Sequence, residues 1–355
     1  MINVENWEER KQRYEEYWTL KNRTPILFLT APKEGGSYDY EKPDSKTFWF
    51  DPAWNIGANR HGYRNTYFGA DSYPYVSPSL GPDILSGFLS LEIIYNETST
   101  WVRHRDVELS EFRDFTLDRD NFYFKKMEEI LNAYVEDARN LDYIVGMVDL
   151  NTLLDGVASL IGPERLCLEM YDHPEEVRRV TREHLRLYKE VFTFYNGIVT
   201  RYQKGNTNWL GIYSDIPWYY ISNDFMVMVS GDFFDEFIDE PLREMVDFHP
   251  RTLFHLDGEN AVVHLDRLLK IRNLTGVQVQ ATPAAQSAEL WIPYIRKIQA
   301  AGKCAWVEAR HRGDVMEFIK NLEPEGLFIK TWAETEEDAK ETERIVQNYY
   351  KGGRA

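Results

Sequence analysis

A histidine and an aspartate stand two residues apart in the segment LFHLDG, residues 253–258. Successive side chains of a strand point to opposite faces, so His255 and Asp257 project from the same face. Gly258 then permits a sharp turn where the strand ends. A histidine and a carboxylate so placed can bind one divalent cation or act as a general acid–base pair. A buried histidine that hydrogen-bonds the aspartate and holds the strand end is the structural alternative, and the spacing alone does not separate the two.

Another carboxylate, Glu308, ends a second strand-like run. With His255 and Asp257 it can complete a His/Asp/Glu ligand set, which suits zinc or another divalent ion with an open coordination position. An ion pair between Glu308 and an arginine is the alternative. Arg310 has the same parity in the strand and His311 follows it, so both are candidates to hold a substrate.

Further polar and aromatic residues stand where strand-like runs end. Asp149 and Asp224 are expected to orient a substrate, although turning the backbone is the commonest role of a loop aspartate. Gln280, Trp218 and Tyr220 are the other predicted substrate-binding residues. The remaining polar candidates are Asn151, Asp215, Gln278 and Lys330, and the aromatic candidates are Trp49, Trp54, Tyr63 and Tyr67. Such aromatic residues can wall a pocket for an apolar or ring-shaped ligand, or they can be ordinary core material.

These candidates must be positioned by strands that alternate with helices. Short runs rich in β-branched and aromatic residues predict eight buried strands over residues 25–30, 72–77, 143–149, 208–214, 252–256, 276–281, 303–308 and 326–331. Helical periodicity predicts helices at the N-terminus and over residues 118–138, 174–203, 233–247, 288–301 and 335–350. Eight strands alternating with helices favour an α/β fold of the (β/α)₈ TIM-barrel type, in which catalytic groups gather at the carboxyl ends of the strands.

The first strand is followed by a long segment, residues 33–71, rich in Gly, Asn, Tyr and Trp. We expect it to be an irregular insertion, and loops of this length in compact domains are usually functional or partly disordered. No linker divides the chain, so one barrel domain is predicted over residues 1–355. No Gly-x-Gly-x-x-Gly follows a predicted strand and no Walker loop is present, which argues against a nucleotide cofactor.

Composition limits the classes of partner. The formal net charge of −17 disfavours nucleic acid and anionic lipid as ligands. The charged N-terminus lacks the apolar run of a signal peptide, and no apolar stretch is long enough to span a bilayer. Two cysteines, Cys167 and Cys304, do not make a disulfide framework, so we expect a reduced, cytoplasmic setting. With nucleic acid and membranes disfavoured, we expect a small-molecule substrate. A homodimer is compatible with this composition.

Several segments resemble the uroporphyrinogen decarboxylase superfamily in their order along the chain. They are DLNTLLDGVASLIGPERLCLEMYDHP (149–174), SNDFMVMVSGDFFDEFIDEP (222–241), HLDG (255–258) and HLD (264–266). The resemblance covers roughly residues 70–350 and is closest to an uncharacterised branch that carries HLDG after the fifth strand. It implies a (β/α)₈ barrel with its pocket at the carboxyl ends of the strands.

The superfamily includes the decarboxylase and zinc-dependent methyltransferases that serve corrinoid proteins or coenzyme M. The decarboxylase has an arginine-rich stretch after its first strand, whereas residues 30–36 here read TAPKEGG. The methyltransferases bind zinc through His-x-Cys after the fifth strand and a further Cys near the last strand. His255 matches that histidine, Asp257 replaces the cysteine, and residues 326–331 contain no cysteine.

Three functions follow as hypotheses. The first is a zinc-assisted methyltransferase in which His255, Asp257 and Glu308 hold the ion and a separate corrinoid protein accepts the methyl group. Its substrate would be a small O-methyl compound, because a metal site of histidine and carboxylates suits an oxygen ligand better than a thiol. The second is a cofactor-free decarboxylase or other lyase acting on a smaller acid, in which Asp224 or Asp257 stabilises a cationic intermediate and His311 or Arg310 holds the substrate carboxylate. The third is a catalytically inert barrel that binds a tetrapyrrole or aromatic ligand.

Overall fold

In the computed structural model, which describes residues 4, 6–97, 99–140, 142–282 and 287–352, seven strands form the main sheet. The strands are β1 (Ile26–Pro32), β2 (Thr66–Ala70), β7 (Trp218–Ser222), β8 (Arg251–Asp257), β9 (Gly276–Gln280), β10 (Cys304–Ala309) and β11 (Leu327–Trp332). Their order is β2-β1-β11-β10-β9-β8-β7. All neighbours are parallel except β2, which pairs antiparallel with β1. The carboxyl ends of the six parallel strands therefore share one edge.

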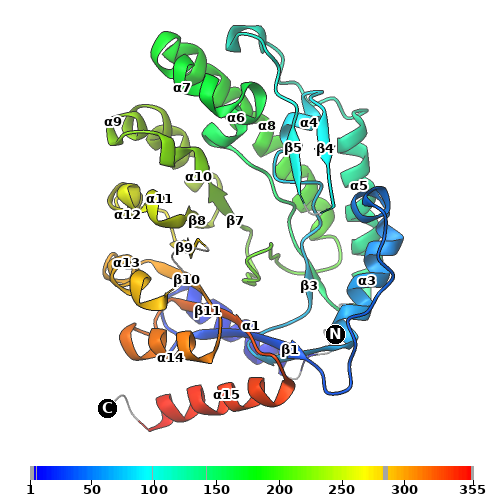
Figure 1. Ribbon diagram of the computed structural model, residues 1–355, viewed down its shortest axis with the longest axis vertical. Coiled ribbons are helices and arrows are strands. Elements are labelled where there is room, and N and C mark those ends of the chain that lie inside the picture. Colours follow the sequence, from blue (N-terminus) through cyan, green and yellow to red (C-terminus); the bar gives the residue numbers. More distant parts are fainter. Residues whose placement is uncertain (1–3, 5, 98, 141, 283–286, 353–355) are drawn as a thin grey trace.

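The second and third predicted strands form a separate parallel pair, β3 (Tyr75–Val76) and β6 (Ile144–Val145). Within the described residues no backbone ladder joins this pair to β1 or β7, so the sheet is open and the expected closed barrel is not formed as one continuous sheet. The Tyr219 side chain connects β7 to the segment that follows β6. Its hydroxyl donates to the Val148 carbonyl at 2.7 Å and accepts from the Leu150 amide at 2.8 Å. Figure 1 shows the strands around a common centre with helices outside them.

The predicted fourth strand is wrong. Residues 208–214 are irregular and make a single isolated bridge between Asn206 and Ser214, whereas the strand that pairs with β8 is β7. Two local features break the extended pattern: the Asn208 side chain accepts from the Leu210 amide at 3.1 Å, and Gly211 has a φ of 77°. Figure 1 shows this green segment between β7 and β3.

The segment over residues 33–71 is not the irregular insertion that we expected, because it contains α2 (Ser45–Phe50), α3 (Pro52–Arg64) and β2. Asp44 caps α2 by accepting from the Thr47 amide at 2.7 Å. Asp51 caps α3, whose first residue is a proline. These signals are short and local, and the Gly- and Asn-rich composition concealed them.

Helices cover the outer side of the strands (Figure 1). The remaining α-helices are α1 (Trp7–Trp18), α4 (Ile84–Phe88), α5 (Phe122–Asp137), α6 (Leu153–Ile161), α7 (Pro163–Asp172), α8 (Pro174–Val199), α9 (Gly231–Phe233), α10 (Asp239–Phe248), α11 (Gly258–Ala261), α12 (Leu265–Leu269), α13 (Ala288–Ala300), α14 (Arg312–Asn321) and α15 (Glu336–Lys351). Short 3₁₀ or π turns are η1 (Leu109–Glu111), η2 (Ala138–Asn140), η3 (Asp224–Met228), η4 (Phe234–Ile238) and η5 (Val262–His264), and β4 (Ile93–Tyr95) pairs with β5 (Thr100–Val102).

The six predicted helices are confirmed with shifted ends, except that the one over 233–247 is interrupted by the π turn η4. No described helix combines the length and the apolar character that crossing a bilayer requires.

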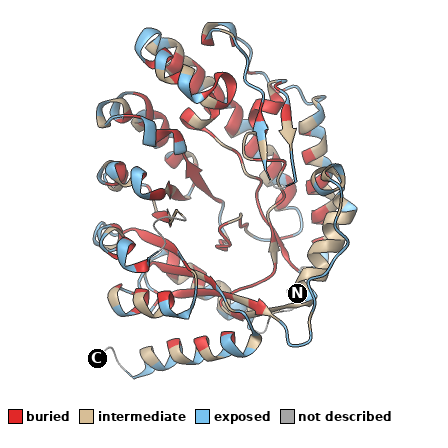
Figure 2. Cartoon of the chain, viewed as in Figure 1, coloured by how far each residue is buried: buried red, intermediate tan, exposed pale blue. Residues whose placement is uncertain are grey.

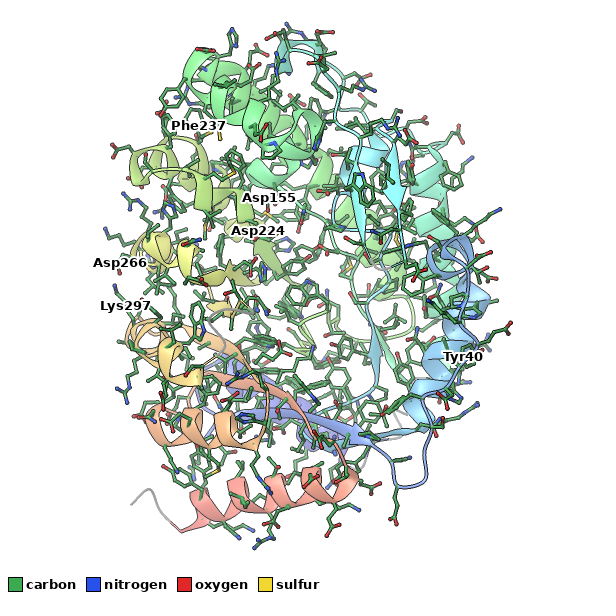
Figure 3. The ribbon with its side chains drawn as sticks, in the orientation of Figure 1. Tyr40, Asp155, Asp224, Phe237, Asp266 and Lys297 are labelled. Atoms are coloured by element: carbon green, nitrogen blue, oxygen red, sulfur yellow. The ribbon has the colours of Figure 1, made fainter. Side chains whose placement is uncertain are left out.

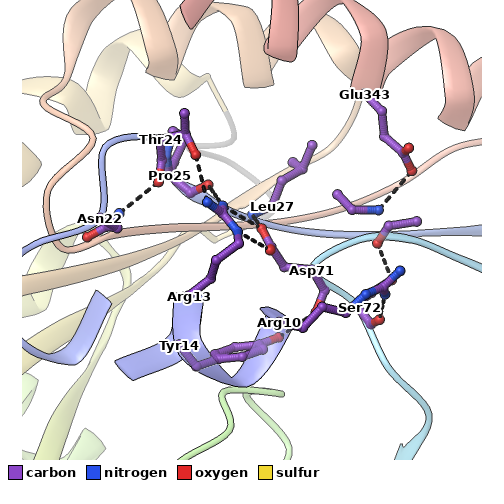
Figure 4. Close-up of polar contacts among 12 residues, drawn as sticks. Arg10, Arg13, Tyr14, Asn22, Thr24, Pro25, Leu27, Asp71, Ser72 and Glu343 are labelled. Carbon is purple, nitrogen blue, oxygen red and sulfur yellow. Dashed lines mark hydrogen bonds and ion pairs between the residues drawn. The ribbon is translucent and has the colours of Figure 1, made fainter. Parts of the chain in front are cut away.

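The strands and the helix faces turned toward them are buried (Figure 2). Helix α1 is fastened below the sheet by a polar cluster shown in Figure 4. Arg13 donates to Asp71 and to the Pro25 carbonyl, both at 2.9 Å, and Asp71 also accepts from the Leu27 amide at 2.9 Å. Because Leu27 lies in β1, this network ties α1 to the first strand at the end opposite the candidate residues.

Candidate functional site

His255, Asp257 and Asp224 form a group at the carboxyl end of β8. One ligand atom from each lies within 4.8 Å of the others. The predicted common face of His255 and Asp257 is confirmed by their places in β8, and Gly258 turns the chain there with a φ of 76°. Asp224 comes from η3, directly after β7. Neighbouring parallel strands thus bring Asp224 next to His255 and Asp257, which follow it by more than thirty residues in the sequence.

The imidazole of His255 is oriented by glutamines on the next strand. Gln278 is the register partner of His255, and its side-chain oxygen contacts the imidazole Nδ1. The amide nitrogen of Gln278 donates to the Gln280 side-chain oxygen at 3.0 Å, which turns the Gln278 oxygen toward the ring. Because an amide oxygen only accepts, Nδ1 carries the hydrogen and Nε2 keeps a free lone pair. His255 Nε2 lies 3.9 Å from Asp224 Oδ1.

Asp224 is positioned by Asp155, a residue that the sequence analysis missed. The backbone amides of Asp224 and Phe225 both donate to the Asp155 carboxylate at 2.8 Å. Burial raises the pKa of Asp155 to about 8, and the charge of Asp224 adds to the increase. Figure 3 shows Asp155 and Asp224 next to each other near the middle of the molecule. The available signal was an acidic residue in the first turn of a helix that follows a strand.

Asp224 is itself perturbed. Its side chain is 56% exposed, yet partial burial raises its pKa, the His255 ring lowers it, and the charge of Asp257 raises it further. Two carboxylates that face one imidazole repel each other, and a bound cation relieves that repulsion. The described residues supply no Lys or Arg that pairs with Asp224 or Asp257.

Asp149 and Tyr220 make a second polar contact beside this group. The Tyr220 hydroxyl donates to Asp149, and burial keeps Tyr220 protonated by raising its pKa well above the usual value. Burial also raises the pKa of Asp149 to about 6, although the hydrogen bond from Tyr220 acts in the opposite direction. The Trp209 ring packs edge-on against both Tyr220 and His255, with centroid separations of 5.3 and 5.4 Å. Asp149 is thus a carboxyl group able to exchange a proton near neutral pH.

A separate chain of weaker hydrogen bonds leads from Ser222 on β7 to Asp83, a residue that the sequence analysis did not identify. The Ser222 hydroxyl donates to Asn151, and the Asn151 amide donates to Asp83, both at 3.3 Å. Burial raises the pKa of Asp83. Nothing in the sequence near Asp83 indicated a site, because it lies in a turn before α4.

Glu308 does not join the group, which corrects the predicted metal set. It is exposed on β10, its register partner is Lys330 on β11, and β9 separates it from β8. Two strand spacings place the backbones of β8 and β10 roughly 10 Å apart. Asp224 takes the place expected for Glu308.

The other predicted substrate residues are divided between two regions. Gln280 is the register partner of Asp257, and Tyr220 reaches Asp149, so both lie at the site. Arg310 donates to Asp314 at 2.9 Å, and the His311 ring caps α14. Both line a different cavity of about 220 Å³ beside α15.

Trp218 also lies away from the site, at the start of β7. It is completely buried and packs against Trp18 with ring centroids 5.1 Å apart. Asp215, another sequence candidate, pairs with Lys204 at 2.7 Å and accepts from Tyr213 at 2.7 Å. Lys330 donates weakly to the Trp209 carbonyl at 3.3 Å.

Oxygen and imidazole nitrogen donors suit zinc or another divalent ion. A second group of this kind, Glu108, Glu169 and His173, exists among the described residues. There, Arg165 lies 2.6 Å from Glu108 and 3.5 Å from Glu169, so an arginine already pairs with both carboxylates. The group at β8 is therefore the better candidate for a cation.

Neither a protein-family model nor a curated protein matches the sequence. The structure is similar to a solved methyltransferase from Methanosarcina mazei, with a TM-score of 0.62 and 10% sequence identity. The match covers 96% of this chain and 99% of that chain. At this identity the likeness concerns the fold, and the chemistry has to be argued from the site.

Proposed function

We propose that this chain is a metal-assisted methyltransferase of the uroporphyrinogen decarboxylase superfamily. In this proposal β3 and β6 take the second and third places of a (β/α)₈ barrel, and β7 takes the fourth. Asp224, His255 and Asp257 hold a divalent ion, which we propose is zinc. A small O-methyl compound is the substrate and a separate corrinoid protein is the acceptor.

The contact between His255 and Gln278 is the observation that carries the proposal. A metal-binding histidine needs one nitrogen with a free lone pair and usually donates its other N–H to an oxygen. The contact of His255 Nδ1 with Gln278 supplies that arrangement and leaves Nε2 beside Asp224. A divalent ion held there would act as a Lewis acid toward a ligand oxygen.

The residues around the group have distinct roles in this proposal. Asp155 fixes the position of Asp224 through its two backbone amides. Asp149, held by Tyr220, retains a proton up to about pH 6 and is the group that protonates the departing oxygen. In methyl transfer the O–CH₃ bond breaks, the oxygen keeps the electron pair and takes that proton, and the acceptor supplies the pair for the new bond to carbon.

The decarboxylase hypothesis has less support. It needs His311 or Arg310 to hold a substrate carboxylate, but both residues line the cavity beside α15 and interact with Asp314. Among the described residues no Lys or Arg forms an ion pair with Asp149, Asp224 or Asp257, so an acid substrate would be repelled. The inert-barrel hypothesis leaves the oriented His255 and the raised pKa of Asp149 without a role.

Metal analysis of purified protein tests the proposal. After dialysis with excess zinc and removal of free ion, the wild-type chain should retain about one zinc, and His255→Ala should retain none. Asp224→Asn and Asp257→Asn should each weaken zinc binding, whereas the matched neutral variant Glu308→Gln should bind as the wild type does. Wild-type protein without stoichiometric metal, or unchanged binding by His255→Ala, would falsify the proposal.

A further inference from the structure

A second cavity, of about 620 Å³, lies between the segment over residues 33–71 and the loop that follows β3. Its walls come from α2, α3, α5, the turn before β5 and Trp209. This volume is within the range of small-molecule sites, roughly 300–1,000 Å³. The exposed side chain of Phe48 lies at its edge, so the cavity meets solvent there. The segment over residues 33–71, which we expected to be irregular, therefore supplies one wall of a pocket through α2 and α3.

The lining of this cavity is uncharged. Among the described residues, the sixteen that form it include no Asp, Glu, Lys, Arg or His. Charged residues make up 28% of the chain, so between four and five would be expected in a set of this size. An anion would lose its hydration here with no cation in the lining to replace it, since the nearby Lys330 ammonium is engaged by the Tyr75 hydroxyl and the Trp209 carbonyl. The lining thus selects for an uncharged ligand.

Aromatic side chains from several elements line the cavity and make it suited to a ring. Phe48 and Trp49 come from α2, Tyr75 from β3, Tyr134 from α5 and Trp209 from the segment before β7. Trp49 is held by a hydrogen bond from its indole nitrogen to the Asn96 carbonyl at 2.7 Å. Tyr75 is fixed by a hydrogen bond to the Trp209 carbonyl at 2.9 Å. Fixed aromatic faces of this kind bind planar apolar rings by stacking or edge contacts.

One polar pair in the wall indicates an oxygen on the ligand. The Asn59 amide nitrogen donates to the Tyr134 hydroxyl oxygen at 2.8 Å. Burial raises the pKa of Tyr134, so the hydroxyl keeps its own proton at neutral pH. Among the described residues no acceptor takes that proton. Tyr134 can therefore donate to a ligand oxygen, while the Asn59 carbonyl oxygen can accept from a ligand hydroxyl.

Trp209 is shared by this cavity and by the group at β8. It lines the cavity, and its ring packs edge-on against His255. Trp209 would therefore contact both a ligand in the cavity and the His255 imidazole.

We propose that this cavity binds an uncharged aromatic ring bearing a hydroxyl or ether oxygen, and that such an aromatic ether is the substrate. That the ring is a substrate rests on the proposed function, whereas its binding does not.

Titration calorimetry with 4-methoxyphenol and its anionic analogue 4-methoxybenzoate tests the inference. The wild-type chain should bind one 4-methoxyphenol at least tenfold more tightly than 4-methoxybenzoate. Tyr134→Phe removes the donor and should weaken 4-methoxyphenol binding about tenfold, the worth of one good hydrogen bond. Tyr171→Phe is the matched control, because Tyr171 is 74% exposed on α7. Asn55→Lys adds a cation to the lining on α3 and should reverse the preference in favour of 4-methoxybenzoate.

His255→Ala separates the two proposals. It should abolish zinc binding and leave the affinity for 4-methoxyphenol within about twofold of the wild type. Three outcomes would each overturn the cavity inference, even if the protein binds stoichiometric zinc. In the first, the wild type binds 4-methoxybenzoate as tightly as 4-methoxyphenol or more tightly; in the second, it shows no saturable binding; in the third, Tyr134→Phe and Tyr171→Phe bind 4-methoxyphenol with equal affinity. Saturable binding of 4-methoxyphenol in a protein that takes no zinc would support it while removing the proposed function.

Discussion

The imidazole Nδ1 of His255 contacts the side-chain oxygen of Gln278, and the two residues are register partners on β8 and β9. Gln278 is completely buried, so its amide cannot exchange this contact for water. The contact decides which imidazole nitrogen is a donor and leaves Nε2 to face Asp224. The tautomer of His255 is thus set by a residue on the neighbouring strand and not by a residue close to it in sequence.

Replacing Gln278 should weaken metal binding. Gln278→Leu keeps a similar volume but removes the acceptor, so either tautomer of His255 becomes available and the ring loses its orientation. We expect zinc affinity to fall about 10–100-fold, the usual effect of losing such a partner. Isothermal titration with zinc measures this, and Gln347→Leu on the exposed side of α15 is the matched control. Equal zinc affinity in the two variants would contradict the role given to Gln278.

Tyr220 should control the protonation of Asp149. Its hydrogen bond stabilises the charged carboxylate, so Tyr220→Phe should move the pKa of Asp149 upward from about 6. The carboxyl carbon resonance of Asp149, assigned by its loss in Asp149→Asn, reports the titration. Tyr171→Phe should leave the midpoint unchanged. A midpoint that is unchanged or lower in Tyr220→Phe would show that the contact does not stabilise the charged form.

His184 should make the protein sensitive to acid. It is completely buried in α8, neither ring nitrogen has a partner among the described residues, and burial lowers its pKa from 6.5 to about 4. Between these values the unfolded chain binds a proton that the folded chain does not, so stability present above pH 6.5 is lost as the pH falls toward 4. The loss for one such group is about 3 kcal/mol.

Urea unfolding at several pH values tests this prediction. His184→Leu should reduce the slope of the unfolding free energy against pH between 4 and 6.5. The control Leu168→Ala removes an exposed side chain of α7 that does not titrate, and it should leave the slope unchanged. His249, whose pKa burial lowers to about 3, should account for part of the slope that remains. An unchanged slope in His184→Leu would rule out this source of acid sensitivity.

Asp71 should be important for stability and not for chemistry. Asp71→Ala leaves Arg13 without its carboxylate and the Leu27 amide without its acceptor at the base of β1. Removing one partner of a buried ion pair lowers the free energy of unfolding by about 3–5 kcal/mol. The exposed pair Lys42–Glu97 is the comparison, and Lys42→Met should change the unfolding free energy by at most about 1 kcal/mol. Loss of zinc binding in folded Asp71→Ala would contradict the separation between this network and the site.

The sequence by itself determined the features that depend on local periodicity. Alternation within one strand placed His255 and Asp257 on a common face, and three- and four-residue spacing located the long helices. The fourth strand was misplaced because the run over 208–214 is as apolar as a strand, while Asn208 and Gly211 break its extended conformation. Residues 218–222, which form β7, carry aromatic residues that fit a pocket wall as well as a strand, so their local pattern does not identify them as the fourth strand.

The tertiary structure alone decided which groups meet. The sequence predicts Glu308 as the third metal ligand and Asp224 as a residue that orients the substrate, but β9 separates β10 from β8, whereas η3 follows the adjacent strand β7. The same is true of Asp155 beneath Asp224, Tyr220 on Asp149, and the uncharged cavity built from α2, α3 and α5. Strand order and the course of loops depend on the packing of the whole chain, so no spacing within one segment contains that information.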